Sequence, residues 1–110
     1  MKKNELLAKI RNLPAKQQLA VWIILNKFKK KKYTFQVSDF AEAIKKYLLP
    51  KDTKDLARMI GGILSSLVRN KIIKPLTGGR DVIWTIDPDI KKYAGACSDQ
   101  IFSVVTYWEK

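Results

Sequence analysis

The stretch from Asp52 to Arg69 places apolar and polar side chains on opposite sides of a helix. At about 100° per residue, the apolar side holds Leu56, Ile60, Ile63, Leu64 and Leu67. The other side holds Lys54, Arg58, Gly62, Ser65 and Arg69. This second side carries three cations and no large apolar group. The pattern predicts a helix that buries its apolar side and can press its bare cationic side against a bulky anion.

A two-stranded hairpin is predicted directly after this helix. Strands over residues 72–76 and 82–86 flank the loop at 77–81, whose glycines supply the positive φ that such a loop needs. Pro75 cannot donate to a β-ladder, which places its strand at a sheet edge. Arg80 near the loop tip either enters a DNA minor groove or contacts phosphates, or it belongs to a plain solvent-exposed turn. The loop is therefore a second candidate contact.

The residues before the amphipathic helix predict four further elements. We expect a short helix over residues 2–12, an apolar helix over about 14–28, a strand over 33–37, and a helix from Ser38 or Asp39 to about Leu48. Asp39 and Glu42 have the spacing of a capping box. Asp52 or Thr53 is expected to cap the amphipathic helix, which we place at 53–69. Two helices joined by a short turn are typical of a helix-turn-helix.

Gly61 and Gly62 lie in the middle of the amphipathic helix. Each costs about 1 kcal/mol of helix stability relative to alanine, so their presence needs a reason. One reason is close approach of the backbone to a DNA strand or groove edge, and the other is close packing against another helix. We favour the first reason, and the sequence leaves both open.

The C-terminal residues predict a helical extension at 87–110. Asp87 caps a helix whose first residue is Pro88, and this helix is expected to run to about Ala94 with Gly95 closing it. Residues 98–110 combine a helical spacing of polar residues with β-branched and aromatic content, and we choose a helix over a strand. Their apolar coverage exceeds the need of a lone surface helix, so a symmetric dimer contact is expected.

The net charge of +12, from 22 Lys plus Arg against 10 Asp plus Glu, predicts attraction to a polyanion. The lysine run at 29–32 has two interpretations. It is a solvated helix end, or it is a phosphate-contacting patch that adds affinity without sequence choice.

Several classes of site are disfavoured by the composition. The chain has no histidine and one cysteine, which exclude a zinc site and a histidine-based triad. Cys97 is expected to be a small buried hydrophobe. No apolar run approaches the roughly 20 residues that cross a bilayer, and the first residues lead into an amphipathic helix rather than a signal peptide. We expect a soluble protein in the cytoplasm, or in the host cytoplasm if the chain is viral.

From residue 14 to residue 86 the expected order is helix, strand, helix, turn, helix and hairpin. The residues from Ile60 to Ile73 place leucines three apart and a double isoleucine after the helix end. In these features the chain resembles the winged helix-turn-helix superfamily, whose recognition helix runs into the first strand of the wing. Lys71 stands where many members have glycine. The small size and the lysine- and isoleucine-rich composition are similar to those of winged-helix proteins from archaea and their viruses.

The resemblance implies a single, mostly helical α+β domain over 1–110, with a winged-helix core at about 14–86 and an extra N-terminal helix. It implies double-stranded DNA as partner and a homodimer, with 53–69 in the major groove and the 77–81 wing on the flanking backbone or minor groove. A transcriptional regulator without a cofactor is the expected function. The residues expected at the DNA are Lys54, Arg58, Gly61, Gly62, Ser65, Ser66, Arg69 and Arg80.

Two other classes of function are alternatives to DNA binding. Winged helices also serve as protein-interaction modules and as parts of replication or RNA-handling machines, so the fold does not decide the function. An interaction module predicts that Gly61 and Gly62 pack on a protein partner and that binding depends little on salt. An enzyme is not expected, because no paired carboxylates mark a pocket and the glycine pairs lack phosphate-loop spacing. Nothing in the sequence marks a small-molecule site.

Overall fold

Helices make up most of the chain, and a small antiparallel sheet joins them. The structure is a computed structural model that describes residues 2–47 and 55–108, with side chains up to residue 102. In chain order the elements are α1 (Lys3–Arg11), α2 (Ala15–Lys27), the 3₁₀ turn η1 (Lys29–Lys31), β1 (Thr34–Phe35), α3 (Val37–Lys45), α4 (Leu56–Arg69), β2 (Ile73–Pro75), β3 (Trp84–Ile86), α5 (Pro88–Lys92) and α6 (Ala94–Trp108). The expected α+β, mostly helical class is confirmed within these ranges.

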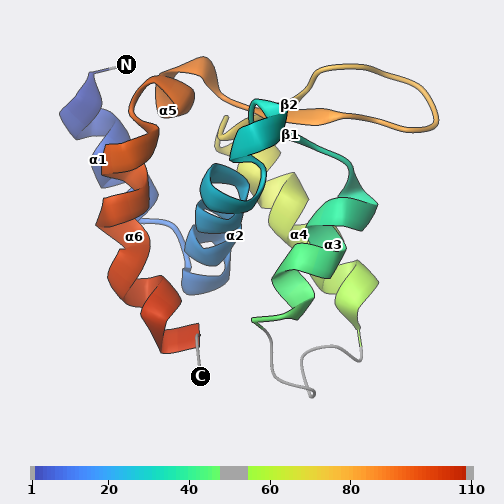
Figure 1. The fold of residues 1–110 in the computed structure, drawn as a ribbon, viewed down its shortest axis with the longest axis horizontal. Helices are drawn as coiled ribbons and strands as arrows, with labels where there is room; N and C mark the ends of the chain where they lie inside the picture. The colour runs from blue at the N-terminus through green and yellow to red at the C-terminus, as the bar shows by residue number, and fades with distance from the viewer. Residues whose placement is uncertain (1, 48–54, 109–110) are drawn as a thin grey trace.

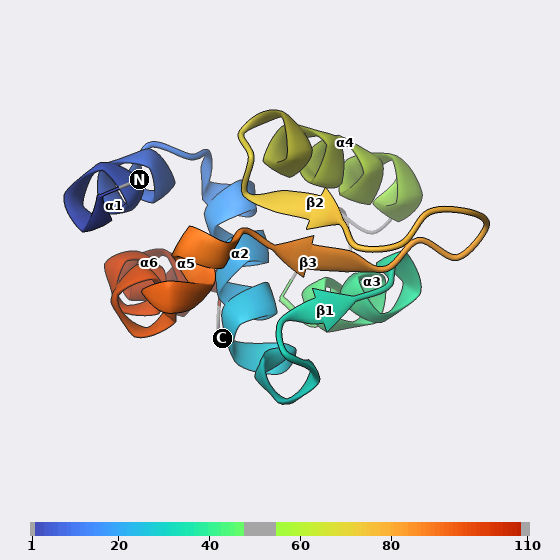
Figure 2. The same cartoon turned by 90° about the horizontal axis from the view of Figure 1, so that it is seen from above.

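Helix α2 runs through the middle of the molecule (Figure 1). Helices α1 and α6 lie on one side of it, and α3 and α4 lie on the other (Figures 1 and 2). The central position matches its composition, because α2 is apolar around most of its circumference and must be covered on several faces. Its buried residues are Gln18, Leu19, Ala20, Val21, Ile23, Ile24 and Leu25.

Gln18 is buried in this apolar helix because its amide holds the turn between α1 and α2. Its Nε2 donates to the backbone carbonyls of Arg11 and Leu13, each over 2.8 Å. The carbonyls at the end of α1 have no partners within the helix, so these bonds satisfy two groups that the turn leaves open. The polar side chain therefore joins α1 to the central helix.

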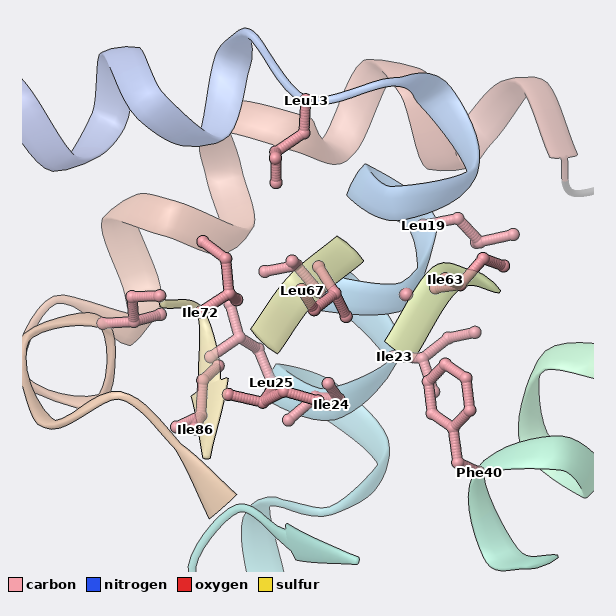
Figure 3. Close-up of a cluster of buried hydrophobic side chains, with 14 of the residues drawn as sticks. Leu13, Leu19, Ile23, Ile24, Leu25, Phe40, Ile63, Leu67, Ile72 and Ile86 are labelled. Atoms are coloured by element: carbon pink, nitrogen blue, oxygen red, sulfur yellow. The ribbon is translucent and has the colours of Figure 1, made fainter. Parts of the chain in front are cut away.

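One continuous core lies between α2 and the elements around it. Figure 3 shows side chains from α2, α3, α4 and the hairpin converging, among them Ile23, Phe40 and Leu67. Buried residues of α1 and α6, such as Ile10 and Ile101, extend the same cluster. Because α4 contributes to this cluster along its length, its orientation about its own axis is set by the core.

The sheet has the strand order β1-β3-β2, and both pairings are antiparallel. Thr34 pairs with Thr85 on one side of β3, and Lys74 pairs with Thr85 on the other. Pro75 lies in the edge strand β2, as expected. The strands are shorter than predicted, since β2 covers Ile73–Pro75 and β3 covers Trp84–Ile86. Figure 2 shows α4 beside β2 at one sheet edge and the turn that leads into β1 at the other.

The predicted starts of two helices were wrong. Helix α3 begins at Val37, and its N-cap is Gln36, which makes no side-chain cap. The capping box expected from Asp39 is therefore absent. Helix α4 begins at Leu56 with Asp55 at its N-cap, and the expected start at residue 53 is wrong. The expected caps Asp52 and Thr53 lie outside the described residues.

The turn after α4 uses a left-handed residue, and that residue is Lys71. Its φ is 60°, while Asn70 before it has a φ of −86°. Asparagine tolerates this conformation better than lysine, yet Asn70 does not adopt it. Asn70 instead turns its side chain back, and its Nδ2 donates to the carbonyl of Ser66 over 3.0 Å. Lys71, which stands where many winged-helix proteins have glycine, therefore has the backbone conformation that glycine adopts most easily.

The C-terminal extension is helical, as predicted, but it divides at a different place. Asp87 caps α5, since its Oδ2 accepts from the backbone N–H of Asp89 over 3.0 Å. Helix α5 ends at Lys92 and α6 follows from Ala94, so Gly95 lies inside a helix and does not close one. The choice of helix over strand for the tail is confirmed as far as Trp108.

Cys97 is buried on α6, as expected. Burial raises the pKa of its thiol to about 11, because the thiolate would lose its hydration inside the core.

Candidate nucleic-acid interface

The apolar side of α4 faces the core as the sequence predicted. Ile60, Ile63, Leu64 and Leu67 are buried, and Leu56 is half-buried. Since residues at 3.6 per turn keep a constant angular relation, burial of this side turns the opposite side of α4 outward.

The outward side of α4 carries most of the predicted contact residues. Arg58, Gly61, Gly62, Ser65 and Arg69 are all exposed. Arg58 and Arg69 are about three helical turns apart, so they lie on the same side with about 16 Å between them along the axis. The structure thus brings these five residues together on one surface, which we call the cationic face of α4.

The two glycines of this face touch nothing else in the described chain. A Cβ built on Gly61 or on Gly62 meets no heavy atom within 4 Å, apart from the neighbouring backbone of α4 itself. Packing against another helix of the described chain therefore does not account for these glycines. Because Gly61 and Gly62 have no side chains, they expose a stretch of helix backbone that an outside partner can approach closely.

Ser66 is separated from the cationic face. It is half-buried, and its Oγ accepts a hydrogen bond of 2.8 Å from Nε2 of Gln17 on α2. Ser66 therefore fastens α4 to the central helix. Lys54, the remaining contact predicted near this helix, lies outside the described residues.

The loop at 77–81 projects from the sheet beyond the ends of β2 and β3 (Figures 1 and 2). Its base is closed by a hydrogen bond of 2.7 Å from the N–H of Leu76 to the carbonyl of Ile83, and Thr77 Oγ1 accepts from the N–H of Ile83 over 3.2 Å. Gly79 takes a φ of 94°, which explains glycine there. Arg80 is exposed on this loop, as predicted.

An apolar groove that sequence reasoning missed runs between α3 and α4. Its volume is about 650 Å³, and we call it the α3–α4 groove. It is lined by Val37, Ala41, Leu56, Ala57, Ile60, Gly61, Leu64, Ser65, Val68 and Trp84. Val37 is 44% exposed and Val68 is 39% exposed, although both are apolar. A signal was present in the spacing of Ala57, Gly61 and Ser65, small residues four apart on one side of the helix.

The lysine turn at 29–32 lies away from the cationic face. Lys29, Lys30, Lys31 and Lys32 are all exposed. The turn leads into β1, whereas α4 leads into β2 at the other edge of the sheet (Figure 2). Lys32 has a φ of 56° and Tyr33 a φ of 60°, so two consecutive residues are left-handed. The structure therefore gives the chain two separate cationic surfaces.

Within residues 2–47 and 55–108, no group of three or more Asp, Glu or Cys side chains is arranged to hold a metal ion. None of the helices in these ranges combines the length and hydropathy that a membrane span requires. Comparison of the chain with protein-family models, curated proteins and solved structures finds no match. Any functional conclusion therefore depends on the residues themselves.

Proposed function

We propose that the chain is a winged helix-turn-helix DNA-binding protein, in which α4 enters the major groove and the 77–81 loop contacts the flanking backbone or minor groove. A transcriptional regulator that acts as a homodimer is the role we favour. The order α2, β1, α3, α4, β2, loop and β3 supports the proposal, as does the pairing of β1 with β3. This order of elements is the one that the resemblance to the superfamily implies.

The observation that carries the proposal is the composition of the cationic face of α4. Arg58 and Arg69 flank two glycines whose surroundings are open. A guanidinium donates two parallel hydrogen bonds to O6 and N7 of guanine, or it pairs with phosphate oxygens. The absent side chains at Gly61 and Gly62 let the helix axis approach the groove floor. Arg80 on the adjacent loop adds a cation for the flanking backbone or minor groove.

A salt titration of DNA binding tests this proposal. Fluorescence anisotropy with a labelled duplex, at 50 to 300 mM KCl, should give an affinity that falls steeply with salt because bound phosphates release counterions. The double variant Arg58→Glu, Arg69→Glu should bind at least about 30-fold more weakly, since each arginine contact to DNA contributes about 1–3 kcal/mol.

A matched control separates local contacts from net charge. Lys2 and Lys3 are exposed at the start of α1, on the side of α2 away from α4. The variant Lys2→Glu, Lys3→Glu changes the net charge by the same amount, and glutamates suit a helix N-terminus. We expect it to keep most of the DNA affinity. Equal losses in both variants, or binding without salt dependence, would contradict the proposal and favour a protein-interaction module.

A further inference from the structure

The α3–α4 groove has the size and lining of a small-molecule site. Its volume of about 650 Å³ lies within the range of roughly 300–1,000 Å³ that ligand pockets occupy. Its α4 wall runs from Leu56 to Val68, which corresponds to about 18 Å of helix. The groove therefore extends along most of α4 and is almost entirely apolar, which suits an extended hydrocarbon chain.

A smaller hollow adjoins the groove, and we call it the polar hollow because four of the seven described residues that line it are polar or charged. The hollow has a volume of about 340 Å³ and shares Val37 and Trp84 with the groove. Its other lining residues are Gln36, Ser38, Arg80, Asp81 and Val82. Within the described residues Arg80 has no ion-pair partner. The apolar groove thus lies next to a hollow that offers the guanidinium of Arg80 and the hydroxyl of Ser38, beside the carboxylate of Asp81.

We propose that the α3–α4 groove binds a monomeric organic anion with an unbranched apolar tail, of the fatty carboxylate class. The tail lies along α4, and the carboxylate pairs with Arg80 in the polar hollow. The net charge of +12 favours an anionic head. Ten of the described residues line the groove, whereas a stable protein–protein interface needs roughly 20–30 residues a side. The lining therefore favours a small ligand over a protein partner.

Occupancy of the groove has a consequence that rests on the proposed function. Gly61 and Ser65 belong both to the groove lining and to the cationic face. Arg80 is likewise shared between the ligand site and the predicted DNA contact. A bound anion would cover these residues and neutralise a cation, so ligand and DNA compete.

Decanoate is the probe for the binding test, used below its micellar concentration. Isothermal titration calorimetry should give saturable binding with one site per chain. Amide chemical shifts should change at Ala41, Gly61 and Val68 and not along α1. The neutral analogue 1-decanol should bind at least fivefold more weakly than decanoate, and Arg80→Gln should remove most of that difference.

Two variants block the tail site by different means. Ala41→Trp fills the groove from α3, and Val37→Glu places a negative charge at a position already 44% exposed, where folding is little affected. Both should lower decanoate affinity at least tenfold. Lys45→Gln removes an exposed cation of α3 that does not line the groove, and it should leave the affinity unchanged.

Three results would overturn the ligand site. These are no saturable binding of decanoate, shift changes confined to α6, and cosedimentation with phosphatidylglycerol vesicles in place of monomer binding.

A competition experiment adds decanoate to the preformed DNA complex. Decanoate should raise the apparent Kd for DNA at least fivefold. If decanoate binds and DNA does not, the proposed function fails while the ligand site stands; if DNA binds and decanoate does not, the ligand site alone fails.

Discussion

Gln17 on α2 donates a hydrogen bond from Nε2 to Oγ of Ser66 on α4 over 2.8 Å, across 49 residues of sequence. The Oε1 of Gln17 is buried and has no partner among the described residues. The bond therefore holds the candidate recognition helix against the central helix at the cost of one unsatisfied acceptor.

The substitution Ser66→Ala should lower the free energy of unfolding by about 1 kcal/mol, since it leaves the buried amide of Gln17 without its acceptor. Urea denaturation followed by circular dichroism measures this change. Ser65→Ala is the matched control, because Ser65 is the exposed neighbour, and it should stay within about 0.5 kcal/mol of the wild type. The double variant Gln17→Met, Ser66→Ala should recover part of the loss. Equal effects at Ser65 and Ser66 would show that the bond contributes nothing.

The substitution Lys71→Gly should stabilise the fold by about 0.5–1 kcal/mol. Lys71 has a φ of 60°, where a side chain with a Cβ is strained and glycine is not. Thermal unfolding should show a higher Tm. Lys74→Gly serves as control in the extended strand β2, where glycine relieves no strain and should lower the Tm. A lower Tm for Lys71→Gly would mean that the turn is not strained.

Cys97 should make stability depend on pH in the alkaline range. Burial raises the pKa of its folded-state thiol to about 11, from an ordinary value of 9.0. The folded state therefore keeps its proton while the unfolded state loses it, so this contribution is complete below pH 9 and is lost as pH rises toward 11. Comparing denaturation of the wild type and Cys97→Val at pH 8, 9.5 and 10.5 isolates it. If the wild type and Cys97→Val lose the same stability between pH 8 and pH 10.5, the burial effect is contradicted. Fast reaction of the native thiol with a disulfide reagent at pH 8 would contradict it as well.

Phe102 is 56% exposed on α6 and is the residue on which we test the predicted homodimer. Phe102→Glu should convert a dimer into a monomer in sedimentation-equilibrium measurements, because a charge would be buried in an apolar contact. Leu76→Glu is the comparison, since Leu76 is 57% exposed but lies next to the hairpin loop. A wild-type chain that stays monomeric at 100 µM would remove the dimer from the proposal.

Arg80 and the lysine turn should differ in their effects on DNA binding. Arg80→Gln should reduce the slope of log affinity against log salt by about 1, the loss of one phosphate contact. The triple variant Lys29→Gln, Lys30→Gln, Lys31→Gln should change the slope little, because the turn lies at the other edge of the sheet from α4. If the triple variant changes the slope more than Arg80→Gln does, the DNA contacts the lysine turn and not the 77–81 loop.

Burial and strand position were predicted correctly where they depend on the sequence of a single helix or strand. The core side of α4 followed from the spacing of Ile60, Ile63, Leu64 and Leu67, and the edge position of β2 followed from Pro75. These features need only helical periodicity or the missing N–H of proline.

Features that depend on two distant elements were not predicted. The α3–α4 groove requires Val37 of α3 and Val68 of α4 to line the same cavity. The small residues four apart on α4 mark one wall of that cavity, but they do not indicate which element forms the other wall. The start of α3 was missed because Gln36 caps it without a side-chain hydrogen bond, which leaves no signature in the sequence. The sequence predicts that a helix ends at Gly95, but packing of α6 against α2 keeps α6 intact through this glycine.

The position of α6 bears on the DNA sequence that a dimer would select. Since α6 lies across α2 from α4 (Figures 1 and 2), twofold pairing through α6 would place the two α4 helices far apart, near opposite ends of the assembly. Each chain measures 38 × 36 × 25 Å. The two α4 helices of such a dimer could therefore enter major grooves of one duplex only if the centres of the two half-sites lie at least one full turn of B-DNA apart, which is about 34 Å. For such a dimer we expect the operator to be an inverted repeat with a wide central spacer.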